Sequence, residues 1–195
     1  EEAPSSFVDE NLRKRMGETA LKAVRDLGYY NAGTFEFLMD EEKNFYFLEM
    51  NTRLQVEHPV TEEITGIDMV EEQIRIAYGE RLRFTQDDIR LEGHAIEVRV
   101  YAEDPVTFLP SPGQINHLKL PEGQGIRNET AIKGDSKVTP FYDPMIAKLI
   151  VSASTRDEAI AAMTEALKNY EIEGIKTNLP MLSTVIEHQA FKTGD

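Results

Sequence analysis

The chain has 195 residues, a formal net charge of −14 at pH 7 and no cysteine. The negative charge argues against nucleic-acid binding, because few cations are left to neutralise a phosphate backbone. The lack of cysteine excludes a disulfide scaffold and is compatible with a cytoplasmic location, which we expect. No apolar run approaches the ~20 residues of a membrane span, so no membrane partner is expected. The chain begins at Glu1 without a methionine, and we expect it to be a piece of a longer protein.

The first part of the chain predicts a helix followed by a β-hairpin. Asp9 is a good N-cap residue, and apolar residues recur at helical spacing until Gly28 stops the helix. Residues 32–39 and 44–49 are rich in aromatic residues and flank the polar turn 40–43. This pattern predicts two antiparallel strands joined by a short turn.

A short transition over residues 61–66 and then a second helix are expected after the hairpin. Asp68 followed by Glu71 resembles a capping box that opens this helix, and Gly79 ends it. Glu71 and Glu72 are therefore interpreted as capping and solvent-facing residues rather than ligands.

A domain boundary is expected within residues 81–90, which are polar and charged and offer few packing positions. We place it after residue 83, so that the two domains span residues 1–83 and 84–195. Beyond the boundary, strands are expected at residues 93–101, 115–120, 125–132 and 145–153.

The rest of the second part predicts a loop and two helices. Residues 105–113 are rich in Pro, Ser and Gly and predict a loop, while Phe108 and Phe141 are interpreted as core residues. A capping box at residues 155–158 opens one helix, and a last helix is expected over residues 178–188. The fold class is α+β, with a strand-rich second part covered by its terminal helices.

Polar and apolar side chains alternate from Glu49 to Glu57. In an extended chain, successive side chains face opposite sides, so one side would carry two carboxylates, two amides and a guanidinium. An outer surface strand could alternate in the same way. A solvated face, however, usually carries Lys, Thr and Ser rather than oxygen ligands beside an arginine.

A metal site is predicted where this stretch meets the preceding strand. Carboxylates are rarely buried unless they are paired or metal-bound, and two of them facing across a hairpin would repel one another. A divalent cation removes that repulsion, and Mg²⁺ prefers oxygen ligands while leaving positions for water and phosphate. The predicted ligands of this two-metal nucleotide site are Glu36, Glu49 and Asn51.

Several stretches of the chain resemble the biotin carboxylases, members of the ATP-grasp superfamily. Residues 49–62 read EMNTRLQVEHPVTE, and the QVEHP at 55–59 is more specific than the Glu-x-Asn of many ATP-grasp ligases. Residues 97–105, 108–113 and 142–149 match the same family in the same order. The resemblance covers essentially the whole chain. It implies the C-terminal part of an ATP-grasp domain, followed by the biotin carboxylase C-terminal antiparallel sheet with helices.

The resemblance also implies roles for individual residues. Arg53, Gln55 and the Val56 backbone N–H would bind bicarbonate, and an arginine fork fits such a planar anion. Arg53 would support catalysis, and Glu57 would be the general base that deprotonates bicarbonate. For Arg53 the alternative is a salt bridge with Glu57, and His58 is interpreted as structural.

Two further positions match the family. Leu38 would meet the adenine ring of ATP, and Arg99 would stabilise the negative charge that develops on biotin. The alternative for Arg99 is an ion pair with Glu97 or Glu103.

The implied reaction is an ATP-dependent carboxylation of biotin with bicarbonate, through carboxyphosphate. The implied cofactors are ATP, Mg²⁺ or Mn²⁺, and biotin on a carrier protein. The implied partners are the biotin carboxyl carrier protein, a carboxyltransferase component and a second copy of the chain. The glycine-rich lid and the lysines that contact ATP have no counterpart here, so the chain alone is expected to be inactive.

Three alternatives stay open. The simplest is the biotin carboxylase component of acetyl-CoA carboxylase, in fatty acid biosynthesis. The same module of pyruvate carboxylase or of another acyl-CoA carboxylase would look alike, because the acyl acceptor binds elsewhere. A fragment that only folds and dimerises, without chemistry of its own, is the third.

Overall fold

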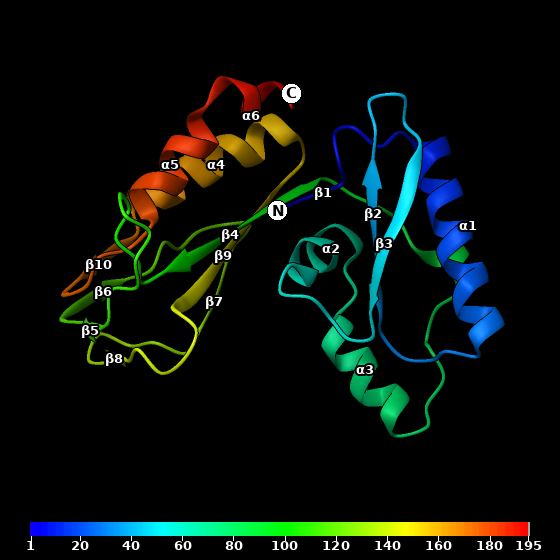
Figure 1. Ribbon diagram of the computed structural model, residues 1–195, viewed down its shortest axis with the longest axis horizontal. Coiled ribbons are helices and arrows are strands. Elements are labelled where there is room, and N and C mark those ends of the chain that lie inside the picture. Colours follow the sequence, from blue (N-terminus) through cyan, green and yellow to red (C-terminus); the bar gives the residue numbers. More distant parts are fainter. Residues whose placement is uncertain (195) are drawn as a thin grey trace. The chain divides into compact units, whose positions relative to one another are not determined.

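The computed structural model describes residues 1–194, which form two compact units (Figure 1). Residues Pro4–Leu91 make the hairpin unit, and Glu1–Ala3 together with residues 92–194 make the sheet unit. The predicted domain boundary after residue 83 remains a prediction, and the compact units meet along the chain between Leu91 and Glu92. None of the helices in the described part of the chain is long and apolar enough to cross a membrane.

The hairpin unit begins with helix α1 (Glu10–Leu27). The Asp9 side chain accepts a hydrogen bond from the Leu12 N–H at 3.0 Å, and Gly28 ends the helix with φ of 63°. The residues at the two ends explain where the helix begins and ends, because Asp caps free N–H groups and Gly tolerates the left-handed conformation. The predicted helix is confirmed.

Strands β2 (Thr34–Met39) and β3 (Phe45–Asn51) form the predicted antiparallel hairpin. Their register places Glu36 directly opposite Glu49, and a bulge follows between Glu36 and Phe37. Residues directly opposite one another in an antiparallel pair point to the same face. The register therefore brings the two carboxylates together.

Helix α2 (His58–Thr65) lies where a short transition was expected, so that expectation is wrong. Pro59 occupies the first turn and Gly66, with φ of 69°, ends the helix. Proline at the start and glycine just past the end are helix signals, but eight residues are too few to show a helical period. Pro59, Val60 and Ile64 are buried, so α2 is firmly packed.

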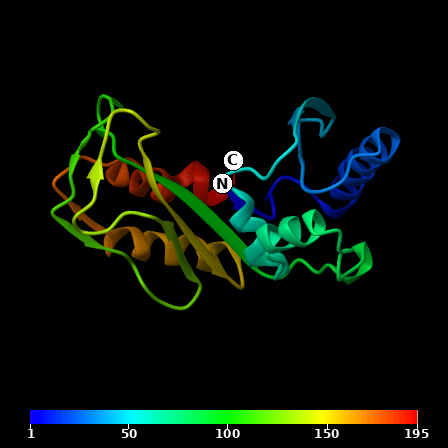
Figure 2. The ribbon, with the colours of Figure 1, turned by 90° about the horizontal axis from the view of Figure 1, so that it is seen from below.

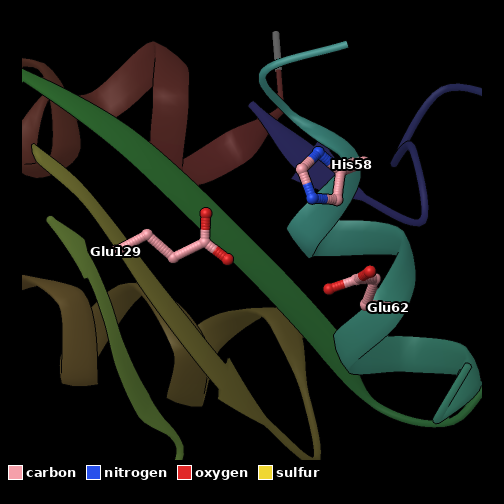
Figure 3. Close-up of side chains that lie close together, drawn as sticks. All are labelled: His58, Glu62 and Glu129. Carbon is pink, nitrogen blue, oxygen red and sulfur yellow. The ribbon is translucent and has the colours of Figure 1, made fainter. Parts of the chain in front are cut away.

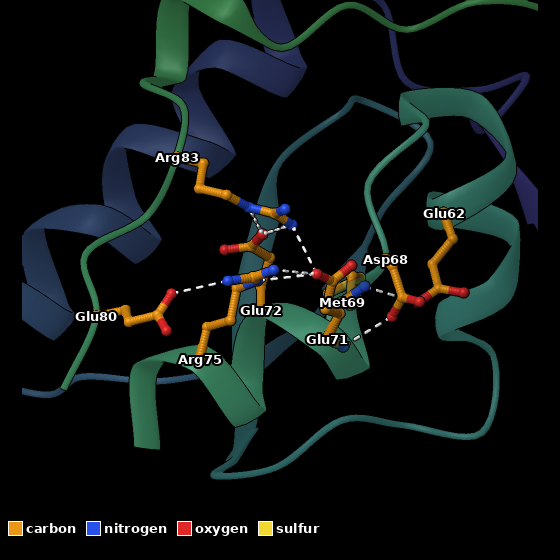
Figure 4. Close-up of polar contacts among 8 residues, drawn as sticks. All are labelled: Glu62, Asp68, Met69, Glu71, Glu72, Arg75, Glu80 and Arg83. Atoms are coloured by element: carbon orange, nitrogen blue, oxygen red, sulfur yellow. Dashed lines mark hydrogen bonds and ion pairs between the residues drawn. The ribbon is translucent and has the colours of Figure 1, made fainter. Parts of the chain in front are cut away.

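Helix α3 (Met69–Ala77) starts as predicted, with the Asp68 carboxylate accepting from the Glu71 N–H at 2.7 Å. The interpretation of Glu72 as solvent-facing is wrong, because the residue is only 5% exposed. Arg83 donates to its carboxylate, and Figure 4 shows this pair beside a network of ion pairs on α3. No local pattern indicates this pairing, because Arg83 lies eleven residues further along the chain.

The segment after α3 contributes few side chains to packing, as its composition indicated. Leu82, Phe84 and Ile89 line an apolar pocket of about 380 Å³ in the hairpin unit, and a short 3₁₀ turn (Gln86–Asp88) lies between the latter two. Among residues 81–90 only Phe84 and Ile89 are partly buried and the others are exposed, so the expectation of few packing positions is confirmed.

The sheet unit is built on a four-stranded antiparallel sheet in the order β1-β4-β9-β7. Its strands are β1 (Glu2–Ala3), β4 (His94–Tyr101), β9 (Met145–Ala153) and β7 (Ile126–Thr130). Two small sheets pair β5 (Gly113–Gln114) with β8 (Lys137–Val138), and β6 (His117–Lys119) with β10 (Glu171–Glu173). The α+β fold class is confirmed.

Helices α4 (Arg156–Lys168), α5 (Leu179–Glu187) and α6 (Gln189–Thr193) complete the sheet unit. Figures 1 and 2 show α4 running alongside the strands β4 and β9. Alternate residues of these strands, such as Val98 and Leu149, pack with Met163 of α4 in the core. The predicted capping box of α4 is present, with reciprocal bonds between Thr155 and Glu158.

The interpretation of Phe108 and Phe141 as core residues is wrong. They are 58% and 84% exposed, respectively. Phe108 lies in a turn closed by a hydrogen bond from its N–H to the Asp104 carbonyl at 2.8 Å, and its φ is 58°. Composition alone does not distinguish such an exposed loop aromatic from a core residue.

Glu2 joins the short strand β1 to the helices of the sheet unit. Its carboxylate contacts His94 Nε2 at 2.7 Å and accepts from Arg156 Nε at 2.7 Å. Arg156 also donates to the backbone carbonyls of Phe191 at 2.7 Å and Lys192 at 2.9 Å. Burial raises the pKa of Glu2, but the bonds from Arg156 and His94 outweigh it and hold that pKa below its ordinary value.

Glu2→Gln is expected to reduce the free energy of unfolding at pH 7 by about 1–3 kcal/mol, because it removes charge-assisted hydrogen bonds. A carboxylate whose pKa is lower in the folded state stabilises the fold above its unfolded pKa, and this contribution is lost as the pH falls through the folded value. Denaturant unfolding should therefore show a gap between wild type and variant that closes below pH 4.5. The exposed Glu173→Gln is the control, and an equal gap at pH 3 and pH 7 would contradict the account.

Candidate active site

Glu36 and Glu49 are held together by an amide from the end of β3. The Asn51 Nδ2 group donates to Glu36 Oε1 at 2.7 Å and to Glu49 Oε1 at 3.1 Å. The register of the hairpin places the two carboxylates on one face, and the amide N–H groups offset their mutual repulsion. The structure therefore brings together all three residues that the sequence predicted as metal ligands.

The strand ends at Asn51, yet the side chains of Arg53 and Gln55 reach back to the same cluster. Arg53 Nη2 donates to Asn51 Oδ1 at 3.1 Å, and Gln55 Nε2 donates to Glu36 Oε1. Strand β3 ends at Asn51, with bends at residues 52–53 and a turn at 56–57, so the expected extended face from Glu49 to Glu57 is wrong beyond Asn51. The side chains converge through a turn rather than along a strand.

Arg53 is held at a second point by its own loop. Its Nη1 donates to the Leu54 backbone carbonyl at 3.0 Å, and the residue is exposed. A guanidinium held at two of its nitrogen atoms keeps a defined direction. It places a fixed positive charge beside Asn51, at the end of the carboxylate cluster.

A tight turn connects this cluster to helix α2. The Gln55 carbonyl accepts from the His58 backbone N–H at 3.3 Å, and the His58 ring Nδ1 lies 2.7 Å from the same oxygen. Glu57 is the N-cap residue of α2, and its side chain makes no capping bond. Figure 3 shows His58 and Glu62 one turn apart on this helix.

Leu38 lies on β2, two residues after Glu36, and is 59% exposed. Its predicted contact with the adenine ring remains a prediction. The exposure is compatible with a side chain that covers a flat ligand.

Arg99 lies on β4 of the sheet unit. Its Nη2 is 2.7 Å from a carboxylate oxygen of Glu1. Neither Glu97 oxygen has a hydrogen-bond partner among residues 1–194, and the alternative ion pair of Arg99 with Glu97 or Glu103 remains a prediction. On the same sheet face, Lys148 pairs with Glu129 at 2.6 Å.

Glu97 is fully buried two residues before Arg99. Burial raises the pKa of Glu97 to about 7, although the nearby Lys148 ammonium acts in the opposite direction. A buried carboxyl group without hydrogen bonds disfavours its charged form. The sequence named Glu97 only as a possible partner of Arg99, and the alternation of β4 did not indicate its burial, because it places Glu97 on the same face as the partly exposed Arg99.

Glu97→Gln is expected to stabilise the protein at pH 8 and to have much less effect at pH 5. The unfolded chain releases the Glu97 proton near pH 4.5 and the folded chain only near pH 7, so folding becomes less favourable between these values. Denaturant unfolding of both proteins at the two pH values measures the difference. A loss of stability at pH 8 would show that the carboxylate is needed in its charged form.

The family of the chain follows from comparison with known proteins. A model of the biotin carboxylase C-terminal domain matches residues 97–195, and a model of the ATP-binding domain of the carbamoyl-phosphate synthase L chain matches residues 1–85. The chain belongs to the biotin carboxylase family. The resemblance carried by the QVEHP stretch and the motifs that follow is thereby confirmed.

Curated members of the biotin carboxylase family match over the full length of the chain. It is 67% identical to the biotin carboxylase of Halalkalibacterium halodurans and 63% identical to biotin carboxylase 2 of Bacillus subtilis. It covers 43% and 44% of these relatives, respectively. The chain therefore spans less than half the length of the relatives it matches.

Solved structures of the family have the same fold. The biotin carboxylase domain of Hydrogenobacter thermophilus 2-oxoglutarate carboxylase, solved as a dimer with MgADP, ADP and bicarbonate, matches with a TM-score of 0.97 at 50% identity. The match covers 100% of this chain and 43% of that one. The biotin carboxylase of Campylobacter jejuni also gives a TM-score of 0.97, at 47% identity.

Proposed function

We propose that this chain is the C-terminal part of an ATP-dependent enzyme that carboxylates biotin on a carrier protein with bicarbonate. The observation that carries the proposal is the hydrogen-bonded cluster of Glu36, Glu49, Asn51, Arg53 and Gln55. It combines oxygen ligands for a metal ion with donors for an anion within one short stretch of chain.

Glu36, Glu49 and Asn51 would hold Mg²⁺ or Mn²⁺. The donor set fits, because two carboxylates and one amide have oxygens of the kind these ions prefer; the Asn51 amide, whose Nδ2 faces the carboxylates, would turn its oxygen toward the ion. Such an ion, when bound, neutralises charge on the phosphates of ATP. Leu38, exposed on the same strand as Glu36, would contact the adenine ring.

Arg53, Gln55 and the Val56 backbone N–H would bind bicarbonate. The Arg53 fork supplies two parallel donors and a fixed charge, which orients the anion. Glu57 follows directly and would accept the proton of the bound bicarbonate as general base. Arg99 would stabilise the negative charge that develops on biotin.

Relatives support this assignment and leave the final acceptor open. The Hydrogenobacter thermophilus structure contains MgADP and bicarbonate in a dimer, and we infer a homodimer for the full-length protein. Relatives also belong to carboxylases that are named for propionyl-CoA, 2-oxoglutarate and pyruvate. We infer acetyl-CoA carboxylase, and thus fatty acid biosynthesis, as the first candidate. A biotin carboxyl carrier protein and a carboxyltransferase component would be its partners.

Bicarbonate-dependent release of phosphate from ATP tests the proposal. The full-length protein should release phosphate only when Mg²⁺ and bicarbonate are both present, and the 195-residue chain alone should not. Bicarbonate-dependent hydrolysis by the chain alone would contradict the expected division of the site. A full-length protein without this activity would overturn the proposed function.

A further inference from the structure

His58 makes two contacts with one carbonyl oxygen at the start of α2. Its backbone N–H donates to the Gln55 carbonyl at 3.3 Å, and its ring Nδ1 lies 2.7 Å from that oxygen. A carbonyl oxygen carries no proton, so the Nδ1 atom must carry the hydrogen and donate it. The Gln55 carbonyl is thus held from two directions by one residue.

This carbonyl belongs to the same peptide unit as the Val56 N–H. The peptide group is planar and trans, so its N–H points opposite to its C=O. Fixing the Gln55 oxygen toward His58 therefore fixes the Val56 N–H to point away from the start of α2. Bonds accepted by a carbonyl also polarise the amide and strengthen its N–H as a donor.

The turn is anchored at one end by packing and at the other by the carboxylate cluster. Pro59 and Val60 directly after His58 are buried, so the first turn of α2 is a rigid base. Figure 3 shows the His58 ring at the first residue of this helix. At the other end, the Gln55 side chain donates to Glu36 Oε1. The peptide between Gln55 and Val56 is thus held on both sides.

We propose that His58 is a positioning residue for bicarbonate, which aims and polarises the Val56 N–H through the Gln55 carbonyl. The inference rests on the proposed function, in which the Val56 N–H is an anion donor. It assigns no proton transfer to His58. The ring acts through its Nδ1–H, which the imidazolium form also carries.

Substitutions at His58 in the full-length protein separate positioning from simple packing. His58→Ala removes the ring donor, and we expect the KM for bicarbonate to rise about tenfold, the effect of one well-placed hydrogen bond. The KM for ATP should stay within about twofold. In His58→Asn the side-chain N–H lies as many bonds from the backbone as Nδ1 does, so this variant should recover most of the bicarbonate affinity. His58→Gln, with its donor one bond further out, should not.

Two results from these kinetics would overturn the inference. One is an unchanged KM for bicarbonate in His58→Ala. The other is a parallel rise of both KM values together with a lower melting temperature in the Ala and Asn variants, which would mean that the ring only packs. His117→Ala, at an exposed histidine on β6, is the matched control and should change neither KM.

A spectroscopic measurement on the full-length protein tests the direction of the amide itself. Gln–Val occurs once among residues 1–195, at residues 55–56, so carbonyl-¹³C glutamine with ¹⁵N valine labels this peptide and no other within that part of the protein. Val56→Ile identifies the signal, because it removes the labelled nitrogen. At a bicarbonate concentration near the wild-type KM, this signal should shift in wild type and His58→Asn and much less in His58→Ala.

The outcomes of this titration distinguish the two proposals. If bicarbonate does not change the chemical shift of the Val56 amide in wild type, the proposed role of the Val56 N–H is wrong, and so is the function assigned to this turn. If the signal shifts equally in wild type and His58→Ala, the Val56 N–H does bind bicarbonate but His58 does not position it.

Discussion

Glu49→Gln in the full-length protein is expected to reduce bicarbonate-dependent ATP hydrolysis by about 10²–10³-fold, the usual effect of removing one group that stabilises transition-state charge. The change keeps the size of the side chain and removes one of the two carboxylates that Asn51 bridges. With a neutral amide in that place, the cluster offers a divalent cation only one negative charge. Affinity for Mn²⁺, measured by electron paramagnetic resonance, should fall together with the rate of phosphate release.

Glu41→Gln is the matched control for this experiment. Glu41 is an exposed carboxylate in the turn of the same hairpin, so the same chemical change there should leave both measurements unaltered. Equal Mn²⁺ affinity in wild type and Glu49→Gln would show that Glu49 does not bind the metal.

Arg53→Lys is expected to lower kcat/KM for bicarbonate by about 10²-fold, because an ammonium group cannot replace two parallel N–H donors. In the structure the guanidinium donates through Nη2 to Asn51 and through Nη1 to the Leu54 carbonyl. A lysine retains the charge but can make only part of this arrangement. The charge alone would therefore be insufficient to orient the anion.

Steady-state kinetics with varied bicarbonate measure this effect, and the KM for ATP should change little. Arg90→Lys is the control, because the Arg90 guanidinium donates to backbone carbonyls of its own loop, far along the chain from the cluster. If Arg53→Lys were as active as wild type, the bidentate role of the guanidinium would be wrong.

The parts of the fold that could be predicted from sequence are those set by local chemistry. Asp9 and Gly28 bound α1, and Thr155 with Glu158 opens α4, because caps and left-handed glycines act within a few residues. Strand β9 also has the expected bounds, since its apolar run ends at turn residues.

The parts that sequence missed depend on contacts between distant residues or on very short elements. Helix α2 is eight residues long and begins inside the polar motif, so its apolar spacing was hidden. Glu72 is buried because Arg83 folds back onto it. The exposure of Phe108 and Phe141 follows from the loops that carry them, and composition does not report it.

The candidate site could be predicted in its membership but not in its geometry. The register set by the hairpin turn would pair Glu36 with Leu48, and the bulge next to Glu36 shifts the pairing to Glu49, so the approach of the two carboxylates required coordinates. Alternation along a strand was the wrong reason for Arg53 and Gln55, which reach the cluster through bends. The two hydrogen bonds from His58 to the Gln55 carbonyl could be found only in the structure, because no local sequence pattern indicates how the imidazole ring is oriented.

The most direct test of the central claim is the position of a bound cation. Crystals of the full-length protein grown with Mn²⁺ and ADP should give an anomalous-scattering peak within about 2.5 Å of oxygens from Glu36, Glu49 and Asn51, with the Arg53 guanidinium beside it. A manganese peak bound by other residues, with these three side chains still in the hydrogen bonds described above, would contradict the account.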